Sequence, residues 1–129
     1  MSVQFSSLAG LRVEVDRVQY DPSLGAPKDR PFPFAYHLSI HNDSEETVTL
    51  FGRKWVVTDS STGQTLVVEG DGIVGQFPRL TPGKVFSYNS YHVILNESRV
   101  TGAFFGTTDK GTPVRVTIPD FTMSPPMLA

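Results

Sequence analysis

The chain has 129 residues, with 11 basic and 13 acidic side chains and a formal net charge of −2. This length predicts one domain over 1–129, with its patterned part at about 11–126. The small negative charge creates no field that would attract nucleic acid or an anionic membrane, so we expect neither partner. The chain has no cysteine, which excludes disulfides, thiolate metal ligands and a cysteine nucleophile.

Apolar and polar residues alternate in several short segments, which is the period of strands with one buried face. The first strand is predicted over 11–20, and its apolar phase shifts near Asp16–Arg17, which predicts a β-bulge there. A surface loop rich in proline and glycine follows at 21–27. The next strand, 34–41, carries Phe34 and Tyr36 on a large apolar face that we assign to the core.

The stretch from Leu50 to Tyr88 contains the only tryptophan, Trp55. A strand tryptophan is usually buried between the sheets of a sandwich, so we expect Trp55 in the core. Arg53 has the same strand parity and is predicted to lie at the rim, where its guanidinium would hold a loop or a partner's carboxylate. Gly52 marks a break or bulge just before it.

Further strands are expected at 66–68, at 85–91, around 102–106 and at 114–118. Tyr88 lies on the inward face of its strand, and Pro119 is expected to end regular pairing because it has no N–H. No window shows apolar residues at helical spacing over three turns. Seven or eight short strands therefore predict an all-β, antiparallel, immunoglobulin- or fibronectin type III-like sandwich, with a barrel as the competing closure.

Gly70, Gly72 and Gly75 have the spacing of a phosphate-binding loop. The residues that follow do not begin a helix, so the dinucleotide-binding interpretation fails on context. Glycines that permit positive φ at a wide corner are the favoured explanation. A backbone nest for an anion, with charge from Arg79, remains the alternative.

Groups for catalysis do not converge in this sequence. His37 and His41 share a strand face but lie too far apart to bind one metal ion, and we predict no metal site and no cofactor. No serine lies in a Gly-x-Ser-x-Gly elbow. We therefore predict that the chain is not an enzyme. The N-terminus lacks the pattern of a signal peptide, and a cytoplasmic location is expected.

Several short motifs occur in a fixed order along the chain: Phe34-Ala35-Tyr36, Arg53-x-Trp55, Gly70-x-Gly72-x-Val74-Gly75, Leu80-x-Pro82-Gly83, Phe86-x-Tyr88-x-Ser90 and Ile118-Pro119-x-Phe121. This ordered set resembles the ApaG family (DUF525 domain) over about 11–126. The resemblance implies the same sandwich fold. It also implies a loose link to divalent-cation efflux and to diadenosine polyphosphate metabolism, and a pyrophosphate site at the glycine loop.

The family resemblance further implies protein binding, because related domains occur in eukaryotic F-box proteins and in a polymerase-interacting protein. This sequence departs from the family at Tyr88-Asn89-Ser90-Tyr91, which lacks a glycine, and at Ser98, Val100 and Phe104. These changes are compatible with packing and leave the predicted fold unchanged.

Two functions follow as hypotheses. The first is a non-enzymatic module that binds a protein through its loops and sheet edges, with Phe32, Ile73 and Phe77 as exposed contact residues. The second is binding of pyrophosphate or a nucleotide polyphosphate, as a sensor or hydrolase, at the 70–75 loop. A homodimer is a further expectation, because open sandwiches have edge strands that must be protected or paired.

Overall fold

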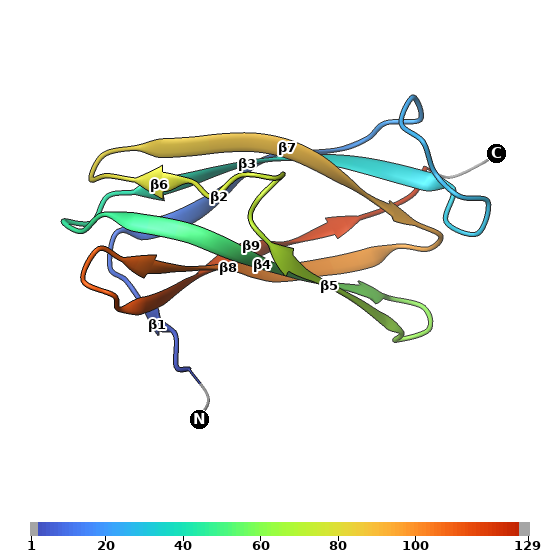
Figure 1. Cartoon of the computed structure of the whole chain (residues 1–129). Helices are drawn as coiled ribbons and strands as arrows, with labels where there is room; N and C mark the ends of the chain where they lie inside the picture. Colours follow the sequence, from blue (N-terminus) through green and yellow to red (C-terminus); the bar gives the residue numbers. More distant parts are fainter. Residues whose placement is uncertain (1–2, 127–129) are drawn as a thin grey trace.

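The computed structural model describes residues 3–126 as two β-sheets packed face to face (Figure 1). The strands are β1 (Ser6–Ser7), β2 (Leu11–Tyr20), β3 (Phe32–Asn42), β4 (Val48–Asp59), β5 (Thr65–Asp71), β6 (Arg79–Leu80), β7 (Val85–Ile94), β8 (Ser98–Thr108) and β9 (Pro113–Met123). The predicted all-β sandwich is confirmed. The strand number is higher than expected, because β1 and β6 are two-residue strands too short to show alternation.

The larger sheet has the order β1-β9-β8-β4-β5, with β6 also pairing with β4, and the smaller sheet has the order β2-β3-β7. Only the short β1–β9 pair is parallel among the described strands. Within residues 3–126, no helix is long and apolar enough to cross a bilayer.

Two of the three register shifts fall where the sequence predicts a bulge. The β2–β3 register shifts between Val15 and Arg17, and the β4–β8 register shifts between Leu50 and Gly52. Each shift returns the following residues to the face that the core requires. As a result Trp55, three residues after the second bulge, points between the sheets and is 2% exposed.

The prediction that Pro119 ends regular pairing is wrong. Strand β9 continues to Met123, and a register shift between Val100 and Gly102 accommodates the irregularity opposite Pro119. A proline is tolerated at a bulge because no ladder hydrogen bond is required from its nitrogen there. Beyond it, Phe121 packs against the core and Met123 is fully buried.

The two sides of the sandwich differ. On one side β2 lies close to β9. On the other side β5 pairs only with β4, and β7 pairs only with β3, so the two facing edges are unpaired within residues 3–126. Figure 1 shows the segment after β5 crossing this open side toward β6. A closed barrel is therefore excluded, and one long opening runs between the layers.

Candidate functional site

The open side contains a groove between β5 and β7 made of three adjoining compartments. The end compartment near the 59–64 turn has a volume of about 450 Å³, the middle one about 280 Å³ and the one at the glycine loop about 390 Å³. The end compartment near the turn shares four lining residues with the middle one: Arg30, Val57, Leu66 and Val93. The middle compartment shares four others with the one at the glycine loop: Tyr36, Arg53, Trp55 and Ser90. The shared walls make the compartments one continuous groove.

The floor of the groove is an aromatic cluster contributed by both sheets. The ring centroid of Trp55 lies 5.0 Å from that of His92 and 4.9 Å from that of Tyr36. Phe121 and Phe104 pack against the same indole, both with centroids 6.2 Å away. Such edge-to-face and tilted pairs each add roughly 0.5–1.5 kcal/mol beyond the burial of area. The cluster therefore joins the layers where no strand does.

The predicted core residues Phe34, Tyr36 and Trp55 are confirmed as buried, and Tyr88 packs against the core while partly exposed. Burial raises the pKa of both the Tyr36 and the Tyr88 phenol, because the charged phenolate would lose its hydration. The Arg53 charge opposes this rise at both tyrosines. The guanidinium thus acts electrostatically on the groove floor.

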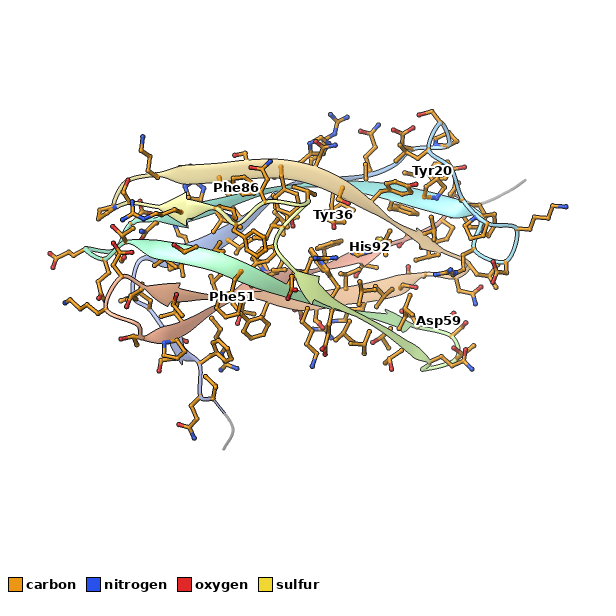
Figure 2. All side chains as sticks on the ribbon, in the orientation of Figure 1. Tyr20, Tyr36, Phe51, Asp59, Phe86 and His92 are labelled. Carbon is orange, nitrogen blue, oxygen red and sulfur yellow. The ribbon has the colours of Figure 1, made fainter. Side chains whose placement is uncertain are left out.

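His92 is the one histidine that enters the groove within the described residues, and Figure 2 shows it between the layers near Tyr36. Its Nε2 atom is buried without a hydrogen-bond partner in residues 3–126. Burial lowers the pKa of His92 to about 4, since the imidazolium would lose solvation. The side chain is therefore neutral at physiological pH.

Arg53 holds the glycine loop, as its strand parity predicts. Its Nη1 donates to the carbonyl oxygens of Asp71 at 2.7 Å and Gly72 at 3.1 Å. Gly70 pairs with Arg53 across β4 and β5, and a Cβ at Gly70 would lie 2.7 Å from Nη2. The glycine at position 70 is needed for this close approach and lies within β5, so the expectation of a corner with positive φ is wrong at this position.

The other two glycines serve different purposes. Gly72 has φ +71°, and a Cβ there would lie 2.8 Å from the carbonyl oxygen of Gln76. Val74 and Gly75 have positive φ, and Ile73 and Gln76 exchange backbone hydrogen bonds around them. This is the geometry of a tight hairpin tip, which confirms the predicted corner for Gly72 and Gly75.

Three amide groups of the glycine loop are already engaged. The N–H of Gly72 donates to the Phe51 carbonyl, and the N–H groups of Ile73 and Gln76 donate to each other's carbonyls. The Arg79 guanidinium forms an ion pair with Asp109 at 2.8 Å and does not line the loop compartment. The structure thus brings Gly70, Gly72 and Gly75 together around Arg53 and keeps Arg79 apart.

The predicted partner-contact residues have different locations. Phe77 is 57% exposed, as expected. Ile73 is fully buried, because its side chain points inward from the hairpin tip, so its predicted exposure is wrong. Phe32 is partly buried against the core beside Tyr20, since β3 begins two residues earlier than predicted. The exposed apolar residue at the tip is instead Val74, at 47%.

Strand β5 is more exposed than an alternating pattern predicts. Leu66 faces the groove but is 47% exposed, and Val67, on the opposite face, is 49% exposed. The inward positions of β5 lack cover because β7 does not pack against them. The register of β4 and β5 determines which side chains face inward. Val68 lies opposite the inward-facing Trp55, and Val67 lies opposite Val56 on the other face.

Sequence reasoning missed Arg30, Leu66 and His92 as groove residues. His92 continues the even-numbered inward positions of β7, so its parity could have identified it. The alternation of apolar residues predicts that Leu66 points inward, but it does not indicate that this side of the sandwich is open. Nothing local marks Arg30, which lies in the loop before β3.

At the far end of the groove, Asp59 caps the 59–64 turn, as expected for aspartates in turns. Its carboxylate accepts hydrogen bonds from the Asn96 amide and from the Ser61 hydroxyl and N–H. These bonds lower the pKa of Asp59 to about 2. The groove thus has a fixed negative charge at this end.

Comparison with known proteins identifies the family. The ApaG domain model (DUF525) matches residues 22–107, which is more than half of the chain. The chain belongs to the ApaG domain family. Protein ApaG of Rhodospirillum centenum is 38% identical over 90% of this chain and 88% of that protein, and Protein ApaG of an Enterobacter strain is 35% identical over 88% and 90%.

Solved structures agree with this assignment. A crystal structure from Bordetella pertussis, described as an ApaA protein, aligns with a TM-score of 0.77 and 26% identity, over 97% of this chain and all of that one. The predicted resemblance to the ApaG family is confirmed.

The His92 environment predicts a pH dependence of stability. Because the folded-state pKa is about 4 and the unfolded value about 6.5, the unfolded chain binds more protons between these values. Stability is therefore complete above about pH 6.5 and declines as the pH falls toward 4, by up to roughly 3 kcal/mol from this residue. In His92→Phe, denaturant unfolding at several pH values should show a smaller loss over this window. If the unfolding free energy of His92→Phe fell with pH as steeply as that of the unchanged chain, the assignment of a buried neutral imidazole would be wrong.

The Arg53–Gly70 contact predicts coupled substitutions. Gly70→Ala displaces the guanidinium, and Arg53→Gln removes it, so each should cost about 1–2 kcal/mol of unfolding free energy through the same lost hydrogen bonds. The double variant should cost little more than either single one. Gly25→Ala, where a Cβ meets open space, is the matched control. Additive costs in chemical denaturation would show that Gly70 acts independently of Arg53.

Proposed function

We propose that this ApaG-family chain is a non-enzymatic binding module that holds an extended segment of a partner protein in the groove between β5 and β7. The continuous groove, bordered by two unpaired strand edges, carries the proposal. An unpaired edge offers backbone N–H and C=O groups in a row, which an extended segment can match by strand addition.

The dimensions of the groove suit such a segment. Strand β5 has seven residues, which corresponds to roughly 23 Å of strand. The edges carry exposed apolar side chains that a partner would cover, namely Leu66 on β5 and Tyr91 on β7, with Leu95 just beyond β7. Burial of these apolar side chains by the partner would contribute to affinity, and backbone hydrogen bonds along the edge would fix the alignment of the partner strand.

The hairpin tip supports the same assignment. Val74 has φ 45°, which is a strained conformation for a β-branched residue and costs on the order of 1 kcal/mol. The strain keeps an apolar side chain exposed at the mouth of the groove, where Val74 lines the compartment next to the glycine loop. Strained backbone conformations cluster at active and ligand-binding sites.

The family's link to divalent-cation efflux fits a regulatory partner, and we place the module in the cytoplasm, where a chain without cysteine loses nothing to the reducing environment. Among residues 3–126, no group of three or more metal-binding side chains gathers. Homodimerisation is a second way to cover the same edges and is distinguished by the mass in light scattering.

Adjacent residues on β5 provide a matched test of the groove. Random twelve-residue peptides would be displayed and selected against the whole chain, and synthetic versions measured by fluorescence anisotropy. Leu66→Ser should weaken the selected peptides by about tenfold, because it removes apolar contact in the groove. Val67→Ser is the control, since Val67 is equally exposed but lies on the opposite face. Equal weakening by both variants would reject the groove as the binding site.

Pyrophosphate or nucleotide binding at the glycine loop is the alternative. It has less support, because the Gly72, Ile73 and Gln76 amides are already bonded and Arg79 pairs with Asp109. What favours it is Arg53, whose guanidinium lies beside Gly70 and Asp71. Calorimetric titration with pyrophosphate and with diadenosine tetraphosphate, with and without Mg²⁺, should show dissociation constants no tighter than about 1 mM. Micromolar binding that is lost in Gly72→Asp would instead favour this alternative.

A further inference from the structure

The middle compartment of the groove differs in charge from the two ends. Its lining includes Arg30 and Arg53 and contains no carboxylate. The compartment near the 59–64 turn is lined by Asp29 and Asp59 as well as Arg30, and the one at the glycine loop by Asp71 as well as Arg53. The centre is therefore the one of the three compartments whose lining carries positive charge and no carboxylate.

The Arg53 guanidinium retains unused hydrogen-bonding capacity. Its Nη1 serves the Asp71 and Gly72 carbonyls, which are neutral acceptors. Its Nε and Nη2 have no hydrogen-bond partner in residues 3–126, and the side chain forms no ion pair there. A guanidinium with open donors is suited to a carboxylate, which it binds through charge-assisted hydrogen bonds.

Three other arginines of the described chain already have an acidic partner. Arg12 pairs with Asp43, Arg79 with Asp109, and Arg99 with Asp120. Those pairs are exposed on the surface, whereas Arg53 is half-buried beside Trp55. Partial burial strengthens the attraction of a charge for an incoming counter-charge.

Neutral polar groups complete the middle compartment. The Tyr36 and Ser90 hydroxyls belong to cross-strand neighbours of β3 and β7 and line it together with His92. Hydroxyl groups can donate to a carboxylate oxygen, whereas the His92 Nε2 atom is buried in the wall. Two arginines and two hydroxyl groups thus surround a space of about 280 Å³.

We propose that the middle compartment selects a carboxylate side chain, aspartate or glutamate, of the extended partner segment, held between Arg30 and Arg53. This inference rests on the proposed function, because it names what the groove accepts. The occupant is a peptide segment because the compartment is continuous on both sides with space bordered by strand edges. A free anion would use only the centre.

Strand geometry converts this charge pattern into a sequence pattern for the partner. Alternate residues of a strand point to the same side, about 7 Å apart. Beside their aspartates, the end compartments contain apolar side chains, Leu66 and Leu95 at one end and Ile73 and Val74 at the other. The partner is therefore expected to carry apolar, acidic and apolar side chains at three successive alternate positions.

Three synthetic nonapeptide mixtures test the pattern. Each has capped ends and leucine or valine two residues on either side of the centre, and the mixtures differ only in a central glutamate, glutamine or lysine. Binding to the whole chain is followed by the emission of Trp55, the single tryptophan, and by the amide NMR shifts of β5 and β7. Glutamate is expected to bind about tenfold more tightly than glutamine and lysine most weakly, with the difference shrinking as salt increases.

Arginine variants assign the preference to the compartment. Arg30→Gln and Arg53→Gln should each reduce the advantage of glutamate over glutamine to about threefold or less. Arg53 also holds the glycine loop, so Arg30→Gln, which leaves those hydrogen bonds intact, provides the test that does not depend on loop order. Arg99→Gln, on the pair with Asp120, is the control and should preserve the advantage.

The outcomes separate this inference from the proposed function. Equal groove binding of the glutamate and glutamine mixtures overturns the carboxylate preference and leaves the binding module supported. No groove binding of any mixture overturns both. Displacement of the glutamate mixture by micromolar inorganic pyrophosphate would reassign the compartment to a free anion and also overturn the inference.

Discussion

The packing of Trp55 between two sheets that meet on only one side is the constraint on which the structure depends. Where β2 lies near β9, the sheets support each other along their length. Toward the open side, Trp55 of β4 packs against Tyr36 of β3 and His92 of β7, and their rings join the layers without closing the gap. An indole that is 2% exposed thus seals the floor of a groove that stays open above it. The same ring therefore stabilises the packing of the two sheets and forms the floor of the accessible groove.

The spacing Gly70-x-Gly72-x-x-Gly75 arises here from three separate steric requirements. Position 70 must leave room for a guanidinium, position 72 for a backbone carbonyl, and position 75 must adopt φ +78° at a hairpin tip. In a nucleotide-binding loop, the same spacing serves the approach of a pyrophosphate to backbone N–H groups. The shared pattern has different physical causes, and the carbonyl groups that point at Arg53 give this loop an electron-rich inner side.

Alternation in the sequence was sufficient to predict the strands, the bulge at Asp16–Arg17 and the inward position of Trp55, because one-sided burial imposes a period of two. It could not predict which strand edges would meet. That depends on how β5 and β7 diverge, and the pattern of Leu66 and Val68 is the same beside a covered or an open edge. The fold was therefore accessible from sequence, whereas the groove was not.

In the candidate site, too, the sequence predicted the positions of some residues and not of others. Arg53 was identified because it lies two residues before Trp55 in the same strand. Side chains two residues apart point to the same face of a strand when no bulge lies between them, as is the case here. Ile73 and Phe32 were misassigned as exposed because loop residues have no period from which burial can be inferred. Arg30 reaches the groove from a loop distant in sequence from β5, and only the packed fold brings the two together.

Open strand edges create a risk of self-association that this structure manages unevenly. On the outward face of β5, Lys54 and Glu69 form an ion pair across the strands, and charges there discourage indiscriminate stacking. The inward face has no such protection and presents Leu66 and Val68 toward the opening. The uncharged inward side leaves the groove accessible to an apolar or extended occupant. The proposed central charge would limit which extended segments are admitted, since an apolar segment would leave two arginines without a counter-charge beside a largely dehydrated floor.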